Sequence, residues 1–449
     1  MNAIVARVAH TRVALIGALL WSFLPSVAMA QEVGVLRISL LEAQGRAVTA
    51  SHRLAEARAR AATAEGAIAV REAAERPIVS LVGGYTRTNH VTEFLVPAPD
   101  GVFRVLYPDA PDNYRARVDA QWPIYNGGRT DALERAARAE ASAASADVGA
   151  AQADLRLEVA RAYWALVTAR AASDVLEQSL ARAQAQVGYV REQLAAGLVP
   201  PNEVASAEAQ ESRQRMLLIE ARNQRDLSSA ELARLIEADL LQPIEPEAVL
   251  ELSAPPAPGE QDLVAEARAK RNERQALEQR IDAAEQVQVA AERAQRPVIS
   301  LAGGVDYARP NPRHFPRTEQ WDRSWDAGIS GSWSFWDGGR ARAEAAQAGS
   351  GITAARERLA EFDSAVALEV RQRLLEIDSG RAAVAAAADS VRAATEASRV
   401  VGERYRAGVI AQTEVLDAEV ARLQAELDRT RALASVRFAE ARLARALGR

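Results

Sequence analysis

The sequence predicts a mainly α-helical protein that carries a small membrane β-barrel and is built from two copies of one pattern. Three observations lead to this fold class. Aromatic residues make up only 5% of the 449 residues, while alanine and charged residues are abundant, which is typical of long helices and coiled coils. Short motifs recur at a nearly constant spacing. Four segments of alternating apolar and polar residues interrupt an otherwise helical pattern.

The first 30 residues predict a secretory signal peptide. Arg7 and Arg12 precede an apolar stretch, and Ala28-Met29-Ala30 gives the small-residue pattern expected before a cleavage site. An uncleaved N-terminal membrane anchor is the alternative, but the apolar stretch is short for a membrane-spanning helix. We therefore expect an exported protein that is cleaved near Ala30.

Two internal repeats are indicated by matching motifs. A segment that begins Arg76-Pro77 matches one that begins Arg296-Pro297, and Gly127-Gly128-Arg129 matches Gly338-Gly339-Arg340. We interpret residues 31–240 and 261–449 as repeats with the order helix, two strands, long helix, tip and helix, separated by a proline-rich linker at 241–260. The Gly-Gly-Arg motifs are expected to be strand-to-helix turns. The segment from about 86 to 115 is longer than its counterpart, which predicts a surface loop.

Strands are expected at about 78–88, 114–125, 298–307 and 325–336. In the second of these, Tyr114, Val118 and Trp122 share one face, and Arg115, Arg117 and Asp119 share the other. A half-buried strand of a soluble protein would look similar, but aromatic residues near the strand ends favour membrane strands. The residues expected at the membrane interface are Trp122, Tyr125, Trp325, Trp333 and Trp336.

Four strands are too few to close a barrel, and an open sheet edge is not tolerated in lipid. Several chains are therefore expected to pool their strands. The helical patterns at about 130–197 and 341–408 would each be roughly 100 Å long. Shorter helical patterns at about 39–75, 199–236, 261–295 and 410–447 are roughly half as long, so two of them stacked end to end would match one long helix. This arrangement predicts a long helical wall.

With these features, the chain resembles the TolC-type outer-membrane efflux proteins over essentially its whole mature length. The resemblance rests on the duplication, the Arg-Pro and Gly-Gly-Arg motifs, and the tip sequences at 193–204 and 405–418. It implies a homotrimer in the bacterial outer membrane, with a twelve-stranded β-barrel, four strands per chain, that continues into a periplasmic α-helical barrel. The linker at 241–260 would then join an equatorial belt around the helical barrel.

The same resemblance implies a passive exit duct of a tripartite efflux pump or type I secretion system. The expected partners are a periplasmic adaptor (membrane fusion) protein and an inner-membrane pump, whose class (RND, ABC or MFS) stays open. The adaptor would contact the two helical tips. These tip residues are Ala196, Gly197, Leu198, Ala407, Gly408 and Val409.

A periplasmic gate is implied at the second tip, with Glu414, Asp417 and Tyr405. In a trimer, the two acidic residues would form carboxylate rings that attract cations, and Tyr405 would tie neighbouring helices together. Surface charges that complement a helix dipole are the ordinary alternative for such a pair. The chain departs from the family at Ile410, where well-known members carry an arginine.

The sequence offers no support for an enzyme, a cofactor or a metal site. It has no cysteine, its four histidines are scattered, and no phosphate-binding loop or clustered basic surface for nucleic acid is present. Two alternatives to a channel remain. A trimeric adhesive stalk would usually place its barrel at the C-terminus, and a periplasmic adaptor would have one central hairpin instead of a duplicated pattern.

Overall fold

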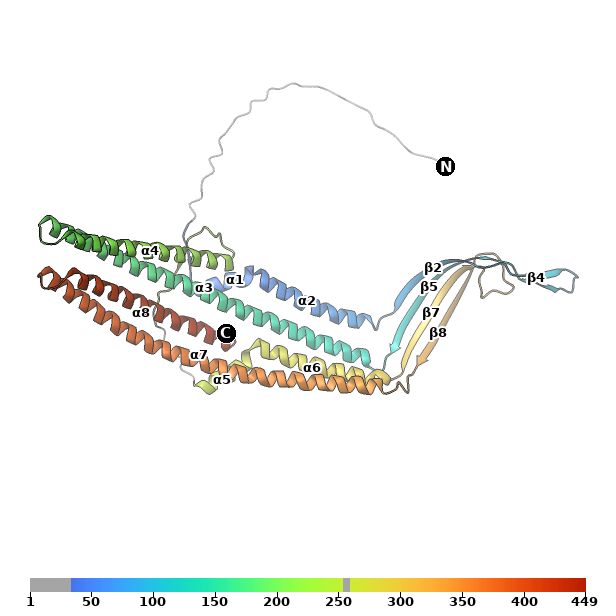
Figure 1. Cartoon of the computed structure of the whole chain (residues 1–449). Helices are drawn as coiled ribbons and strands as arrows, with labels where there is room; N and C mark the ends of the chain where they lie inside the picture. The colour runs from blue at the N-terminus through green and yellow to red at the C-terminus, as the bar shows by residue number, and fades with distance from the viewer. Residues whose placement is uncertain (1–33, 253–258) are drawn as a thin grey trace, which may run out of the picture.

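The computed structural model describes residues 34–252 and 259–449, so the predicted signal peptide at 1–30 lies outside the described residues. Two long helices, α3 (Arg129–Ala195) and α7 (Arg340–Arg406), run along an elongated body. Each has 67 residues, or roughly 100 Å. A β-sheet lies at one end of this body and two helical tips lie at the other (Figure 1).

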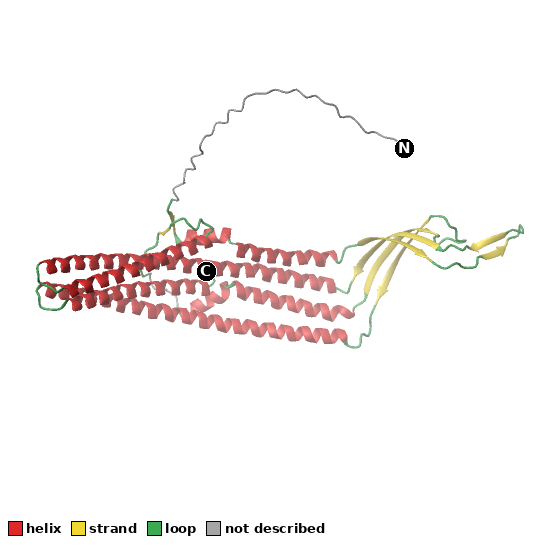
Figure 2. Ribbon diagram, turned by 45° about the horizontal axis from the view of Figure 1, so that its top comes forward, coloured by secondary structure: helices red, strands yellow, loops and turns green. Residues whose placement is uncertain are grey.

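The shorter helices pack along the long ones in pairs. Helices α2 (His52–Ala73) and α4 (Pro201–Leu235) lie along α3, one towards the sheet and one towards the tip. Helices α6 (Asn272–Glu292) and α8 (Gln412–Ala446) occupy the same two positions between α3 and α7. Figure 2 shows the resulting layer of side-by-side helices. None of the helices within residues 34–252 and 259–449 has the length and hydrophobicity needed to cross a membrane.

The prediction of unbroken helices at 39–75 and 261–295 is wrong. Helix α1 (Leu40–Ala50) ends at Ser51, whose hydroxyl accepts a hydrogen bond from the backbone N–H of Leu54 and so starts α2. Helix α5 (Glu260–Lys270) ends at Arg271, which has an extended backbone. The buried Arg271 guanidinium donates a hydrogen bond to Glu273, which also pairs with Arg445 near the end of α8.

The main sheet contains four antiparallel strands in the order β2 (Ile78–Arg87), β5 (Asp112–Tyr125), β7 (Val298–Arg309) and β8 (Asp322–Ser332). The strand expected at 325–336 begins earlier and ends at Ser332. Directly after this end, the indole of Trp333 donates a hydrogen bond to the carbonyl of Gln295, the last residue of the short helical turn before β7.

The pairing register gives the sheet two different faces. One face carries Leu81, Val118, Val305 and Ile329 and is apolar. The opposite face, called the polar face below, carries mainly charged, serine and glycine residues. Its charged members come from three of the strands and are Arg115, Arg117, Asp119, Asp306, Asp322 and Asp326.

Four short strands were not predicted. Strands β3 (Phe94–Pro97) and β4 (Phe103–Tyr107) form a hairpin inside the long loop that follows β2, and this hairpin projects beyond the sheet (Figure 1). Strands β1 (Leu36–Ile38) and β6 (Ile244–Pro246) pair in parallel at mid-height, so that part of the proline-rich linker is bound to the N-terminal segment.

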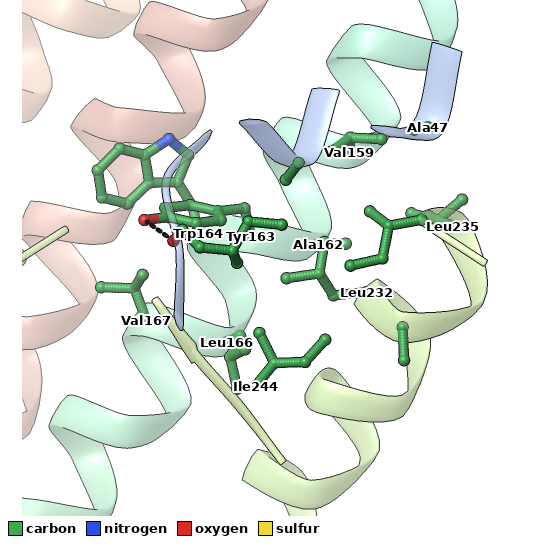
Figure 3. Packing of buried hydrophobic residues seen from close by; sticks show 14 of the residues in the cluster. Ala47, Val159, Ala162, Tyr163, Trp164, Leu166, Val167, Leu232, Leu235 and Ile244 are labelled. Carbon is green, nitrogen blue, oxygen red and sulfur yellow. Dashed lines mark hydrogen bonds between the residues drawn. The ribbon is translucent and has the colours of Figure 1, made fainter. Parts of the chain in front are cut away.

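The largest cluster of buried hydrophobic residues fixes these mid-height strands against α3 and α4 (Figure 3). Tyr163 of α3 is fully buried, and its hydroxyl donates to the carbonyl of Ile38 at 3.3 Å and accepts from the N–H of Ala248 at 3.1 Å. The guanidinium of Arg437 lies 4.9 Å from the ring of Trp164. The Tyr163-Trp164 pair is therefore part of the helix packing.

Candidate functional site

The two helical tips have the same backbone geometry. Gly197 and Gly408 have φ values of +73° and +70°, in the left-handed region that favours glycine. The N–H of Gly197 donates to the carbonyl of Leu194, and the N–H of Leu198 donates to the carbonyl of Gln193. Gly408 and Val409 make the equivalent pair of bonds, and this pattern is a Schellman C-cap. All six predicted tip residues, at 196–198 and 407–409, are exposed.

The structure connects the two tips through Tyr405. Its hydroxyl donates to Oε2 of Glu203 on α4 at 3.0 Å, and its ring meets the ring of Tyr189 on α3 edge-on, with centroids 6.1 Å apart. Burial and then the neighbouring Glu203 carboxylate raise the pKa of Tyr405 to about 12. The hydroxyl therefore stays protonated near neutral pH and can serve as the donor.

Glu414 and Asp417 lie in the first turns of α8, and both are exposed. No described residue forms an ion pair with either carboxylate, so within one chain they are separate from the Tyr405–Glu203 contact. The sequence analysis missed Glu203 as a partner of Tyr405. The alignment of the two repeats could have pointed to Glu203, because Glu203 in the first repeat corresponds to Glu414 in the second.

A second connection between the helical hairpins lies further from the tips. The guanidinium of Arg182 on α3 donates from Nε to Glu419 and from Nη2 to Glu426, both at 3.1 Å and both on α8. These three side chains are largely buried. Arg191 forms a comparable ion pair with Glu208, but this pair remains within the α3–α4 hairpin. Arg182 is therefore a brace between hairpins, and the sequence analysis did not identify it.

The predicted strand-to-helix turn residues lie immediately before α3 and α7 and at their first residues. Gly127, Gly128, Gly338 and Gly339 all have positive φ values, between +68° and +88°. Arg129 and Arg340 are the first residues of the two long helices. The first turn is also held by the second repeat, because Arg293 and Arg296 donate to the carbonyls of Gly128 and Gly127.

Aromatic residues lie near both ends of the sheet. Trp122, Tyr125, Trp333 and Trp336 are at the helix side, and Trp325 lies towards the far end. The indole of Trp122 donates to the carbonyl of Glu75 at 3.0 Å, matching the bond of Trp333 in the second repeat. At the far end, Tyr307 stacks on Trp321 with centroids 4.9 Å apart. All five predicted interface residues are exposed in the single chain.

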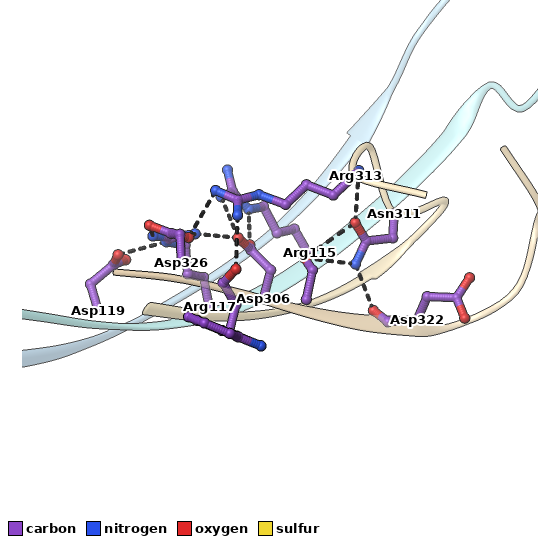
Figure 4. Close-up of polar contacts among 10 residues, drawn as sticks. Arg115, Arg117, Asp119, Asp306, Asn311, Arg313, Asp322 and Asp326 are labelled. Atoms are coloured by element: carbon purple, nitrogen blue, oxygen red, sulfur yellow. Dashed lines mark hydrogen bonds and ion pairs between the residues drawn. The ribbon is translucent and has the colours of Figure 1, made fainter. Parts of the chain in front are cut away.

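The polar face of the sheet carries a network of ion pairs (Figure 4). Arg117 contacts three carboxylates: Asp119 at 2.6 Å, Asp326 at 2.9 Å, and Asp306. Arg115 donates to Asp306 at 2.5 Å. Since Asp306 is almost completely buried, these two arginines satisfy a carboxylate that water cannot reach.

No cluster of three or more histidine, aspartate, glutamate or cysteine side chains that could hold a metal ion is found among the described residues. The charged side chains of the network are instead paired with one another.

The sequence was compared with known protein families and curated proteins, and the fold with solved structures. The pattern of the family described as "Outer membrane efflux protein" matches residues 45–237 and 263–449. No curated protein sequence gives a significant match. Among solved structures, the outer-membrane channel OprN shares 19% identity and a TM-score of 0.73, over 91% of this chain and 89% of that one.

Two further structures have a similar likeness. The outer membrane protein VceC of Vibrio cholerae shares 19% identity and a TM-score of 0.72, over 91% of this chain and 96% of that one. The MtrE outer membrane channel of Neisseria gonorrhoeae, in its open state, shares 21% identity and a TM-score of 0.73, over 91% of this chain and 88% of that one. At these identities the likeness shows the fold.

Proposed function

Because the chain belongs to the outer membrane efflux protein family, we propose that it is the exit duct of a tripartite efflux pump or type I secretion system, and not an enzyme. The observation that carries this proposal is the two-faced sheet. An apolar face suits lipid, and a charged face suits a water-filled interior. Such a duct is passive, and the energy for export comes from its partners.

A homotrimer completes this duct. Strands β2 and β8 lie at the two edges of the four-stranded sheet, and neither has a second neighbouring strand among the described residues. Three chains would pool twelve strands into one closed barrel, which removes the open edges. The long helices continue from these strands and would form the wall of a helical barrel.

The barrel would lie in the bacterial outer membrane, with the helices extending into the periplasm after cleavage near Ala30. The aromatic residues at both ends of the sheet support this placement, because such residues prefer the membrane interface. The exposed tips at 196–198 and 407–409 would contact the helical hairpin of a periplasmic adaptor. An inner-membrane pump of the RND, ABC or MFS class would lie beyond it.

The tips would also form the gate. Tyr405 ties the second tip to Glu203 of the first tip, and this bond must break when the two hairpins separate. Glu414 and Asp417 would form carboxylate rings around the opening. Such rings concentrate cations and repel anions.

Recording single channels in planar bilayers tests the duct and the gate. The wild-type protein is expected to form cation-preferring channels that divalent cations block. In the Glu414→Ala, Asp417→Ala variant, this block should weaken. A matched control, Glu208→Ala with Glu211→Ala, removes two carboxylates at the same spacing from α4, where both pair with arginines, and should leave the block unchanged.

An unchanged current–voltage response in the Glu414, Asp417 variant would reject the gate assignment. Stable membrane insertion of the wild-type protein without conductance would instead favour an adhesive stalk. A protein that stays soluble would contradict both.

A further inference from the structure

One part of the polar face is covered, although most of the sheet is exposed in the single chain. Asp306, Ala308 and Asn311 are 5%, 2% and 1% exposed. Asp306 and Ala308 lie at the end of β7 that is far from the helices, and Asn311 follows that end. They are covered because the start of the segment that joins β7 to β8, residues 310–313, folds back over the polar face (Figure 4), whereas Trp321 at the end of the segment stacks on Tyr307 of the apolar face.

Specific bonds hold this segment in place. The side-chain amide of Asn311 donates to the carbonyl of Asp322 at 2.9 Å and to Ser324 at 3.1 Å. Its oxygen accepts from the N–H of Arg313 at 2.9 Å. The Arg313 guanidinium then pairs with Asp326 at 2.9 Å and donates to the carbonyl of Trp325 at the same distance. Arg313 therefore fastens the segment to β8.

The polar face carries more carboxylates than arginines, and the folded-back segment reduces this excess. The described strands contribute four carboxylates, Asp119, Asp306, Asp322 and Asp326, but only two arginines, Arg115 and Arg117. Arg313 supplies the third positive charge from the segment. Without it, the excess of carboxylates over arginines on this face would rise from one to two in each chain.

We propose that residues 310–313 form an inward collar at the outer mouth of the duct, latched by Arg313. The inference rests on the proposed function, because it requires the polar face to line a pore. The latched collar narrows the exit and offsets part of the negative charge of its wall. When Arg313 releases Asp326, the exit widens and its wall becomes more acidic. The collar thereby limits both the size and the charge of solutes that pass the outer mouth.

A matched control residue lies in the same segment. Arg317 carries the same charge as Arg313, but it donates to the hydroxyl of Tyr107 in the β3–β4 hairpin at 2.8 Å and lies over that ring. It does not contact the carboxylates of the polar face. Arg317→Ala therefore removes a charge from the same segment without opening the latch.

Access of reagents to the pore wall tests the proposal. The chain has no cysteine, so Ser330→Cys places a single thiol on the polar face of β8, deeper in the duct than Asp326. Intact cells are treated from outside with a small methanethiosulfonate or with a maleimide that carries a long polyethylene glycol chain. In the otherwise unchanged protein, the small reagent should react and the long one should react slowly.

In the Arg313→Ala variant, the long reagent should modify the thiol on the order of tenfold faster. The ratio of the modification rates of a cationic and an anionic small reagent should rise by a similar factor. Asp326→Asn should also admit the long reagent, but with little gain in cation preference, because it removes a carboxylate. Arg317→Ala should change neither rate.

The collar is refuted if the long reagent reacts equally fast with and without Arg313, while the small reagent reacts in both. A different result would contradict the duct itself. In that case, the small reagent would fail to reach the thiol from outside in every variant and would react only after the membrane is disrupted.

Discussion

Replacing Gly127 with alanine should destabilise the chain more than the equivalent replacement of Gly338. The two glycines occupy corresponding turns of the two repeats and have nearly the same backbone, with φ values of +68° and +70°. Their surroundings differ. A Cβ atom at Gly127 would lie 2.4 Å from the Cβ atom of Arg296, whereas a Cβ atom at Gly338 would meet no atom within 4 Å.

The magnitude follows from two contributions. A left-handed backbone costs an alanine roughly 1–2 kcal/mol, and this cost is common to both variants. The overlap with Arg296 exists only at Gly127, and relieving such crowding costs about 1–3 kcal/mol. Gly127→Ala should therefore lower the free energy of unfolding by about 1–3 kcal/mol more than Gly338→Ala does.

The assay is denaturant unfolding of the purified proteins in detergent, followed by circular dichroism of the helices. Gly338→Ala serves as the control for backbone strain alone. Equal shifts of the unfolding midpoint in the two variants would refute the close packing of the first turn against the second repeat.

Three further predictions follow from single contacts. Burial alone would raise the pKa of Glu273, but hydrogen bonds from two arginines lower it to about 2 from 4.5. This shift should stabilise the folded chain by about 3 kcal/mol above pH 4.5, and the stabilisation should be lost as the pH falls towards 2. The pH dependence of the free energy of unfolding measures it. Arg182→Ala should free α8 from α3 and raise single-channel conductance, whereas Arg191→Ala, which breaks a pair within one hairpin, should not. Trp333→Phe should lower stability by about 1 kcal/mol, because it removes the indole bond to the carbonyl that ends the preceding helical segment.

Much of the fold could be predicted because its signals are local. The Gly-Gly-Arg motifs and the tip glycines mark positions where only a left-handed backbone joins two elements, so both 67-residue helices end close to the predicted residues. Alternation within β5 also placed Arg115, Arg117 and Asp119 on one face. These features need no information from distant parts of the chain.

The features that were missed depend on partners that are far away in the sequence. The break at Arg271 contains neither proline nor glycine, and the buried Arg271 guanidinium finds its partners Glu273 and Glu369 only in the folded chain. Strand β1 is three residues long and pairs with a segment more than 200 residues away. The Tyr405–Glu203 bond and the Arg313 latch likewise join side chains whose meeting is set by tertiary packing. The roles of the tip and gate residues stay predictions.

The pooling of strands is the central claim, and crosslinking of the sheet edges tests it most directly. Cysteines placed on the polar faces of β2 and β8, at several registers, cannot bridge within one chain, because these strands lie at opposite edges of the sheet. A short bifunctional maleimide applied to isolated outer membranes should therefore link neighbouring chains into a series that stops at three. Products that remain single chains, or that continue beyond three, would contradict a closed barrel shared by three copies.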